Sequence, residues 1–345
     1  MKTKSKFRKG LAVFWLLSLA AIAVGLGWLW VRLDAYEATT PEAAVRQYLK
    51  RVEQGDWNTL VAESGFTPTA LVTEEDYIAW LKEKYADLPQ ETSLVRTGEK
   101  AGSVYLLKDK EGKEIAKLEL TDAPEGEKLA YRVQTQTAAI APFAIEAPQG
   151  AKVLVNGRPL PESALAESAP AQGYEELPEG YTAPQLLRYE LEGLLQEPQV
   201  TVPEGYQVRR SQQGEKTVYE VTGVPAPELE EECLSLAQQV AKTYAAFVTT
   251  DATRTQLNAY LLPGTPFYKA MQQFYNGWYV EHTGYDYRNI DCTELESAGE
   301  NAFSVRVSFD YVVLRGSKEH LYPSDYRLFF LKTDAGWKLT RLDIL

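Results

Sequence analysis

Cysteine and histidine are scarce in this chain. Among 345 residues there are only two cysteines, Cys233 and Cys292, and two histidines, His282 and His320. No Cys-x-x-Cys pair is present, and structural zinc sites take four Cys or His ligands. We therefore expect no metal centre and no cofactor. So few histidines also leave few candidates for general acid–base catalysis.

Basic residues are in deficit over most of the chain. The sequence has 36 Lys and Arg against 48 Asp and Glu, and residues 1–32 hold six of the basic residues and no acidic one. The remaining chain therefore carries 30 basic and 48 acidic residues, a net charge of −18. Such an acidic region disfavours nucleic acid as a partner, because phosphates repel it.

Near the N-terminus lies a long uncharged, apolar run, residues 11–31. As a helix, its 21 residues rise about 30 Å, the thickness of the hydrocarbon core of a bilayer. The basic tail at residues 1–10 contains Lys2, Lys4, Lys6, Arg8 and Lys9. By the positive-inside rule, this tail is cytoplasmic and the chain beyond Arg32 lies outside.

A cleaved signal peptide is the alternative interpretation of this segment. The apolar core of a signal peptide is typically about 7–15 residues, which is shorter than this run. No small-x-small cleavage site follows, because Arg32, Leu33 and Asp34 come next. We therefore expect a single-pass anchor at residues 11–31 that stays in the cell membrane, with the bulk of the chain extracellular.

Three blocks follow the anchor, and the first covers residues 40–138. Thr40 and Pro41 are typical of a helix start, and apolar residues then recur at helical spacing. Thr73 with Asp76 predicts a capping box for a later helix. Strands are predicted at residues 103–107, 114–120 and 129–135. Helices followed by an antiparallel sheet indicate an α+β domain.

The second block, residues 140–225, is rich in short strand-like runs. Asn156-Gly157 after the strand-like run 152–155 predicts a β-hairpin, because a type I′ turn needs positive φ at both central residues. Residues 199–202 and 217–221 are further strand candidates, and residues 161–180 are predicted to be a long loop. We expect a small β-sandwich-like module.

The third block, residues 228–345, repeats the organisation of the first. A helical stripe runs from Leu229 to Phe247, and Thr265-Pro266 predicts another helix. Alternation then predicts a long, half-buried strand, with Phe303, Val305, Val307, Phe309, Tyr311 and Val313 on one face. Residues 326–331 and 337–342 are predicted as two more strands.

These blocks resemble a known family. Gly55-Asp56-Trp57 after a first helix, and a final strand containing Gly336-Trp-Lys-Leu-Thr340, resemble the NTF2-like cone fold. Lys152-Val-Leu-Val-Asn-Gly-Arg-Pro159 is similar to strands of small PEGA-like or Ig-like surface modules. The order of anchor, NTF2-like domain, small β-module and NTF2-like domain resembles the TcaA-like envelope proteins of Gram-positive bacteria.

That resemblance implies a non-enzymatic envelope protein linked to cell-wall homeostasis or antibiotic response, with a wall component or envelope protein as its partner. Members of the family often begin with a cytoplasmic zinc ribbon. Here residues 1–10 contain no cysteine, which argues against a cytoplasmic role.

The candidate site lies in an aromatic-rich segment, residues 267–287. Phe267, Phe274 and Tyr275 follow helical spacing and are expected in the core. The candidates for ligand or partner contact fall off that spacing, beside two glycines: Trp278, Tyr279, His282, Tyr285, Asp286 and Tyr287. Because His282 lies four residues before Asp286, it is either a pocket-lining acid–base group or a loop histidine beside contact aromatics.

The two cysteines both fall in the third block. Cys233 lies on the apolar stripe of the first helix, and Cys292 lies in a strand candidate that this helix should cover. They are either joined by a disulfide, which an extracellular location permits, or remain two buried thiols. In both cases we expect a structural role without catalytic function.

Two functions of different class remain open. The first is a binding or scaffold protein that acts on wall components or envelope proteins. The second is a small-molecule receptor, or an isomerase- or dehydratase-type enzyme, that uses a pocket in an NTF2-like cone. A single candidate histidine without a second catalytic feature favours the first.

Overall fold

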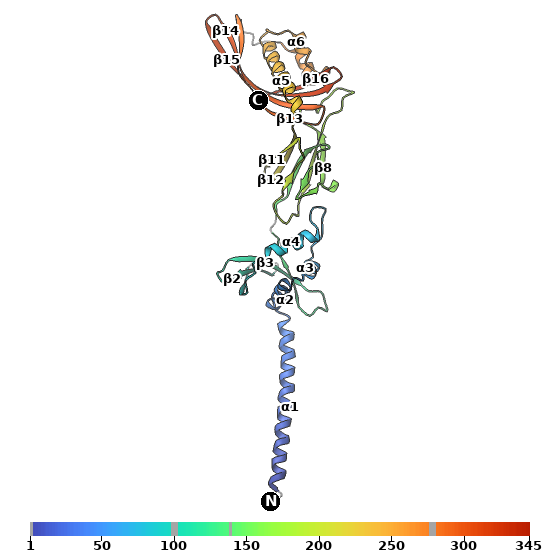
Figure 1. The fold of residues 1–345 in the computed structure, drawn as a ribbon, viewed down its shortest axis with the longest axis vertical. Coiled ribbons are helices and arrows are strands. Elements are labelled where there is room, and N and C mark those ends of the chain that lie inside the picture. The colour runs from blue at the N-terminus through green and yellow to red at the C-terminus, as the bar shows by residue number, and fades with distance from the viewer. Residues whose placement is uncertain (1–2, 98–102, 138–139, 276–280) are drawn as a thin grey trace. The chain divides into compact units, whose positions relative to one another are not determined.

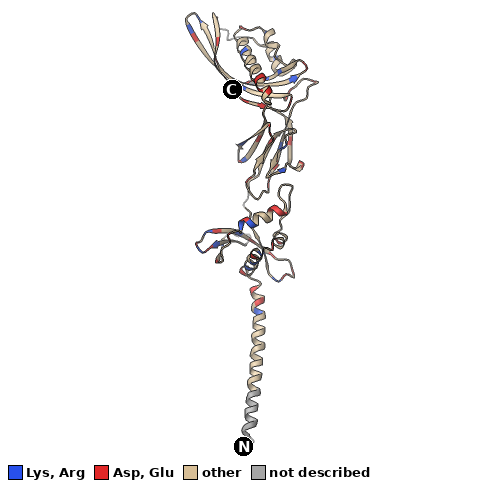
Figure 2. Ribbon diagram, viewed as in Figure 1, with Lys and Arg blue, Asp and Glu red and all other residues tan. Residues whose placement is uncertain are grey.

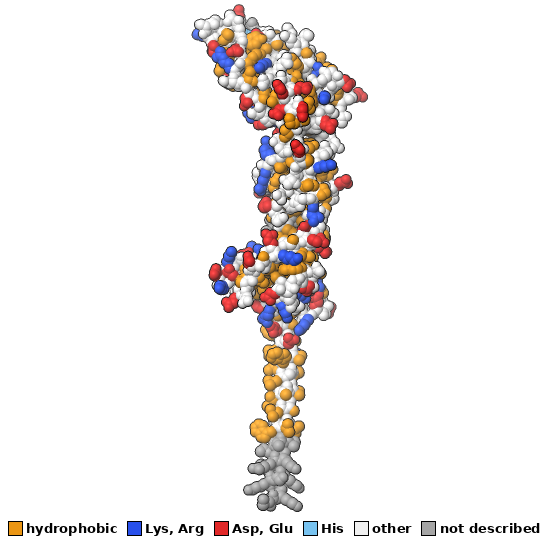
Figure 3. Space-filling model, viewed as in Figure 1, with side chains coloured by type: hydrophobic (Ala, Val, Ile, Leu, Met, Phe, Trp, Pro, Cys, Tyr) orange, Lys and Arg blue, Asp and Glu red, His pale blue; other side chains and the backbone are white. Residues whose placement is uncertain are grey.

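In the computed structural model, which describes residues 3–97, 103–137, 140–275 and 281–345 (the backbone alone for 3–13 and 103), the chain opens with one long helix. This helix, α1 (Thr3–Glu37), exposes large apolar side chains all along its described part, shown in orange in Figure 3. Phe14–Glu37 is long and apolar enough to cross a membrane. The expectation of one apolar helix of membrane-spanning length is confirmed.

The first compact unit, Met1–Ala139, contains α1. After α1, its described residues form three helices and a four-stranded sheet, which can be followed in Figure 1. Its elements are α2 (Pro41–Gln54), α3 (Trp57–Ser64), α4 (Glu74–Lys84), β1 (Thr92–Arg96), β2 (Ser103–Asp109), β3 (Glu114–Asp122) and β4 (Tyr131–Thr135). The strands form an antiparallel meander in the order β1-β2-β3-β4. This arrangement confirms the predicted α+β class.

Local sequence signals explain where these helices start. The Thr40 hydroxyl accepts a hydrogen bond from the backbone N–H of Ala43, and Thr73 and Asp76 form the predicted capping box. Inside, the hydroxyls of Tyr48 and Tyr85 lie 2.7 and 2.6 Å from Thr135 Oγ1. The buried polar groups between the helices and β4 are thereby satisfied.

The second unit, Ile140–Leu345, begins with the β-rich middle block. Its elements are β5 (Phe143–Pro148), β6 (Leu154–Val155), β7 (Arg158–Pro159), η1 (Glu162–Ala164), β8 (Leu165–Pro170), β9 (Gln185–Leu191), β10 (Val200–Thr201), β11 (Tyr206–Gln213) and β12 (Lys216–Gly223). Asn156 and Gly157 have positive φ of 50° and 79°, so the predicted β6–β7 hairpin is confirmed. The predicted loop at 161–180 is wrong in part, because it contains β8. This strand is exposed along almost its whole length, so it lacks the alternation that marks a strand.

The rest of the unit repeats the element order of the first: three helices and then a four-stranded meander. It comprises α5 (Pro227–Val248), α6 (Arg254–Asn258), α7 (Pro266–Gln273), β13 (Gly284–Ser297), β14 (Ala302–Arg315), β15 (Lys318–Thr333) and β16 (Gly336–Ile344). The alternating residues from Phe303 to Val313 are buried, as predicted, and form one core with α5. Two register shifts in β13, at Asn289 and Glu294 with positive φ, are β-bulges that bend the sheet.

Strands of the middle block and of the C-terminal meander belong to one nine-stranded sheet, in the order β16-β15-β14-β13-β12-β5-β9-β8 with β11 on β12. A single residue pair, Gly223 with Ser297, joins β12 to β13. Residues 140–225 and 228–345, expected as two domains, therefore lie in one unit.

A buried turn strengthens this junction. The Tyr174 hydroxyl donates to the backbone carbonyls of Phe303 and Phe330, at 2.9 and 3.1 Å, and its ring packs edge-on against Phe329. Gly173 has φ +86°, and a Cβ there would lie 2.3 Å from the Phe329 ring. The chain can therefore dock on β14 and β15 only with glycine at this position.

Candidate functional site

A partly buried carboxylate lies where α5 ends. Helix α5 closes with a Schellman motif: the N–H of Thr250 donates to the carbonyl of Phe247 and that of Asp251 to the carbonyl of Ala246. Thr250 holds the left-handed position with φ 69°, which a β-branched residue rarely adopts. The turn brings Asp251 back over the last turn of the helix. Strained backbone of this kind is concentrated at functional sites.

Asp251 is the centre of a polar cluster. His282 Nε2 lies 3.0 and 2.9 Å from its two carboxylate oxygens, and the hydroxyls of Thr249 and Tyr311 donate to Oδ2 at 2.5 and 2.8 Å. The side chain of His282 is only 5% exposed and that of Asp251 18%. The carboxylate is thus partly shielded from water and well supplied with donors, which offset the loss of hydration.

Tyr311 stays protonated in this setting. Burial, with a smaller contribution from Asp251, raises the pKa of Tyr311 far above its ordinary value. The hydroxyl is therefore a permanent donor to Asp251 at neutral pH. The cluster joins the end of α5 to the middle of β14, although the residues are 60 positions apart.

Tyr311 also belongs to a group of four tyrosines on neighbouring strands. Tyr287, Tyr311 and Tyr322 are paired in register across β13, β14 and β15, so they share one face of the sheet, and Tyr285 lies two residues from Tyr287 on that face. The rings of Tyr285, Tyr287 and Tyr311 have centroids 5.3–5.8 Å apart. We call these four residues the tyrosine cluster.

The inner and outer members of the tyrosine cluster differ in exposure. Tyr287 donates from its hydroxyl to the carbonyl of Lys242 at 2.8 Å and is partly buried. Tyr285 and Tyr322 remain 41% and 46% exposed. Aromatic side chains that are held rigid by their neighbours and are half open to water are typical anchors for a partner or ligand.

The structure brings together three of the six predicted contact residues: His282, Tyr285 and Tyr287. Trp278 and Tyr279 lie outside the described residues. Asp286 is exposed and bonds Arg288 at 3.2 Å, and Arg288 also forms a forked pair with Glu319. The carboxylate that contacts His282 is thus that of Asp251 rather than that of Asp286. Strand β13 begins at Gly284, between His282 and Asp286, and side chains four residues apart lie together on a helix but not on a strand.

Sequence reasoning did not find Thr249, Asp251 and Tyr322 as site residues. Thr249 and Asp251 occupy a helix end, and nothing in the chain signals that His282, 31 residues later, returns to them. Tyr311 was predicted to lie in the core, and its ring does, but its hydroxyl also donates a hydrogen bond to Asp251. Tyr322 could have been found as an aromatic residue on the strand that pairs with β14, where it lies opposite Tyr311.

Both cysteines are free thiols in the structure, Cys233 buried and Cys292 half-buried. Burial raises the pKa of the Cys233 thiol to about 11 and also raises that of Cys292. Both are protonated at neutral pH, and a thiol rather than a thiolate is a poor nucleophile. In the described part of the chain, no group of three or more His, Cys, Asp or Glu is placed to hold a metal ion.

Comparisons with known proteins add little. No family model matches the sequence, and no curated protein matches it either. One similar solved structure is described as an "Ntf2 like protein involved in plasmid conjugation". The match covers 74% of this chain and 75% of that one, at 10% identity and a TM-score of 0.23. At this TM-score the match supports no conclusion on fold or function.

Proposed function

We propose that this chain is a non-enzymatic, single-pass membrane protein that presents a binding surface outside the cytoplasm. In this proposal residues 1–10 are cytoplasmic, α1 crosses the membrane, and the tyrosine cluster contacts a cell-wall component or an envelope protein. Three helices followed by a four-stranded meander occur in both units, which supports two NTF2-like domains on either side of the β-module. The sequence resemblance to TcaA-like proteins favours a role in the Gram-positive envelope.

The observation that carries the proposal is the exposure of Tyr285 and Tyr322 on a rigid support. Their neighbours Tyr287 and Tyr311 are fixed by hydrogen bonds to Lys242 and Asp251, so the surface is held in position before any partner arrives. Such preorganisation lowers the entropy lost on binding.

A photo-crosslinking amino acid at position 285 tests this role in intact cells, with α1 retained. Tyr181 is the matched control, because it is also 41% exposed but lies in the middle block. We expect an adduct from position 285 that mass spectrometry identifies as an envelope protein or a wall fragment, and none from position 181. Equal adducts from both positions, or none from 285, would contradict the proposal.

A second candidate function is acid–base chemistry on a small molecule, and the His282–Asp251 pair favours it. The Asp251 carboxylate holds the His282 ring through Nε2, which is the arrangement of an oriented acid–base pair. A bound small molecule that copurifies with the wild type but not with a His282→Gln variant would favour this function over the first.

A further inference from the structure

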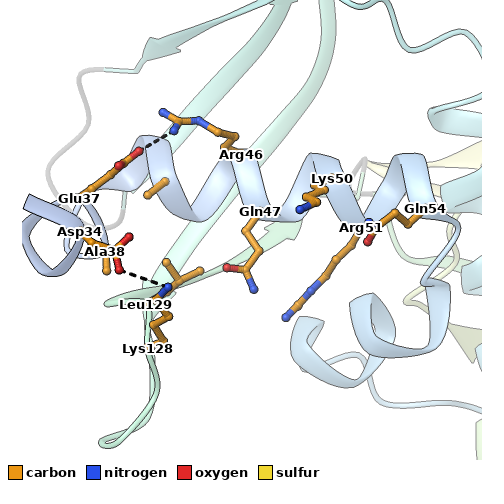
Figure 4. A pocket seen from close by; sticks show the side chains of 11 residues that line it. Asp34, Glu37, Ala38, Arg46, Gln47, Lys50, Arg51, Gln54, Lys128 and Leu129 are labelled. Atoms are coloured by element: carbon orange, nitrogen blue, oxygen red, sulfur yellow. Dashed lines mark hydrogen bonds and ion pairs between the residues drawn. The ribbon is translucent and has the colours of Figure 1, made fainter. Parts of the chain in front are cut away.

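A groove of about 410 Å³ lies at the foot of α1 (Figure 4). One wall is the end of α1, the second is α2, and the third is the turn between β3 and β4. Its charged lining residues are Asp34, Glu37, Arg46, Lys50, Arg51 and Lys128. All of these residues lie in the first unit.

The amphipathic character of α2 produces the polar wall. Ala44, Val45, Tyr48 and Val52 are buried against the unit's core. The opposite positions, 46, 47, 50, 51 and 54, follow helical spacing and all line the groove. The groove is therefore a property of the helix as a whole rather than of one side-chain conformation.

Several contacts fix the groove to the end of α1. The N–H of Ala130, in the β3–β4 turn, donates to the carbonyl of Ala38 at 3.0 Å. Across the groove, Arg46 pairs with Glu37 at 2.5 Å and Lys128 with Asp34 at 3.5 Å (Figure 4). The walls thus come from α1 and from the domain that follows it.

The position of the groove along α1 sets its environment. The uncharged run ends at Val31, and a helix rises about 1.5 Å per residue, so Asp34 and Glu37 lie about 4.5 and 9 Å beyond it. The headgroup layer on each side of the hydrocarbon core is about 5–8 Å thick. In Figure 2 the ribbon carries the colours of acidic and basic residues where α1 ends, next to a tan stretch of the same helix. If α1 spans the membrane, the Asp34 end of the groove lies at the level of the lipid headgroups and the Glu37 end just beyond it.

The charge of the groove is opposite to that of the chain around it. Four basic and two acidic side chains line it, and Arg51 pairs with Glu63 beside it. With Glu63 counted, the groove carries a net charge of +1, whereas the chain beyond Arg32 has a net charge of −18. Among the described residues, Lys50 forms no ion pair. The Lys128–Asp34 pair is largely exposed, so water screens the attraction and Asp34 holds Lys128 only weakly. Both ammonium groups are therefore available to an anion.

We propose that this groove binds the phosphate of an anionic phospholipid headgroup. The inference rests on the proposed function, because it requires α1 to cross the bilayer. Lys50 and Lys128 contact the phosphate, while the polar face of α2 provides hydrogen bonds to the remainder of the headgroup.

Native mass spectrometry of the full-length chain in detergent tests this site. Phosphatidylglycerol and phosphatidylcholine are titrated separately, and bound lipid is counted. We expect the wild type to prefer phosphatidylglycerol, and Lys50→Gln with Lys128→Gln to weaken that binding at least tenfold, since each basic residue near a membrane surface contributes about fivefold. The matched control, Lys110→Gln with Lys113→Gln, removes the same charge from an exposed turn at the other end of β3 and should bind like the wild type.

Three outcomes would overturn the assignment: no preference for phosphatidylglycerol, an equal loss in the control variant, or displacement of the lipid by millimolar inorganic phosphate. The last would identify a soluble phosphate as the ligand. Failure of the proposed function is distinguishable, because a chain that does not insert into phosphatidylcholine bilayers at all has no membrane-spanning α1.

Discussion

At the scale of single residues, the end of α5 is strained. Thr250 adopts φ 69° and is exposed, so its side chain contributes little packing in return. The left-handed conformation costs an L-residue with a Cβ roughly 1–2 kcal/mol, whereas glycine adopts it freely. The Schellman hydrogen bonds of Thr250 and Asp251 fix the turn, and their stabilisation offsets the strain at Thr250.

We expect Thr250→Gly to stabilise the protein by about 0.5–1 kcal/mol, since relief of strain outweighs the added freedom of glycine in the unfolded chain. The shift in urea midpoint measures it. Thr250→Ala retains the Cβ and should give no comparable gain. A lower midpoint for the glycine variant would show that the threonine side chain itself is needed.

The contributions of Asp251 and Asp286 to stability can be compared by the same substitution. Asp251→Asn keeps the shape but removes the charge that accepts from Thr249, His282 and Tyr311, so we expect a loss of about 2 kcal/mol in the free energy of unfolding. Asp286→Asn, at an exposed carboxylate, should change it by less than about 0.5 kcal/mol. Equal effects of the two variants would argue against the cluster as described.

Buried tyrosines give the fold an alkaline limit. Burial raises the pKa of Tyr85 and of Tyr244, one in each unit, to about 12. The unfolded chain releases these protons near pH 10, so between pH 10 and 12 the unfolded state binds fewer protons and stability falls as pH rises. The two thiols act in the same direction from about pH 9, where cysteines of the unfolded chain ionise. We expect unfolding midpoints to begin to fall near pH 9 and to drop more steeply above pH 10. Midpoints that stay level to pH 12 would contradict this.

The site shows what residue patterns alone can and cannot predict. Tyr285 and Tyr287 were predicted as contact residues because they fall off the helical spacing, and their contact with a ligand or partner stays a prediction. The partner of His282 was not, because a contact between a helix end and a strand start 31 residues away depends on tertiary structure. Local spacing instead pointed to Asp286.

At the scale of elements, starts of helices and faces of strands were predictable because local chemistry determines them. The caps at Thr40 and Thr73, the Asn156-Gly157 turn and the alternating face of β14 are all present. The exposed strand β8 was missed, because a strand with water on both faces lacks a hydrophobic period. The pairing of β12 with β13 was equally hidden, because it rests on one residue pair.

That pairing predicts an effect of substitution at Gly223. A Cβ there would lie 2.7 Å from the carbonyl oxygen of Ser297, so Gly223→Ala must push the two strands apart. We expect a loss of about 1–3 kcal/mol in the free energy of unfolding. Gly284→Ala is the control, because its Cβ would meet only Leu314 at an ordinary 3.6 Å. Similar melting temperatures for both variants would mean that the strands separate freely.

At the scale of the whole molecule, the proposed topology can be measured by thiol labelling. In a Cys233→Ala, Cys292→Ala background, Ser168→Cys places a thiol on exposed β8, and Ser5→Cys places one before the apolar run. We expect a membrane-impermeant maleimide to label position 168 in intact cells and position 5 only after permeabilisation. The reverse pattern would invert the orientation.

The Tyr174 turn also constrains the order in which the molecule can assemble. Its two carbonyl partners lie 129 and 156 residues further along the chain, in strands near the C-terminus. A chain that emerges N-terminus first has completed the middle block long before those strands exist. The turn must therefore wait, with Tyr174 exposed, until β14 and β15 have paired, and such long-range contacts form slowly. Folding of the second unit is consequently completed only after β15 has been synthesised, so a chain truncated before β15 leaves this aromatic turn open to chaperones and proteases.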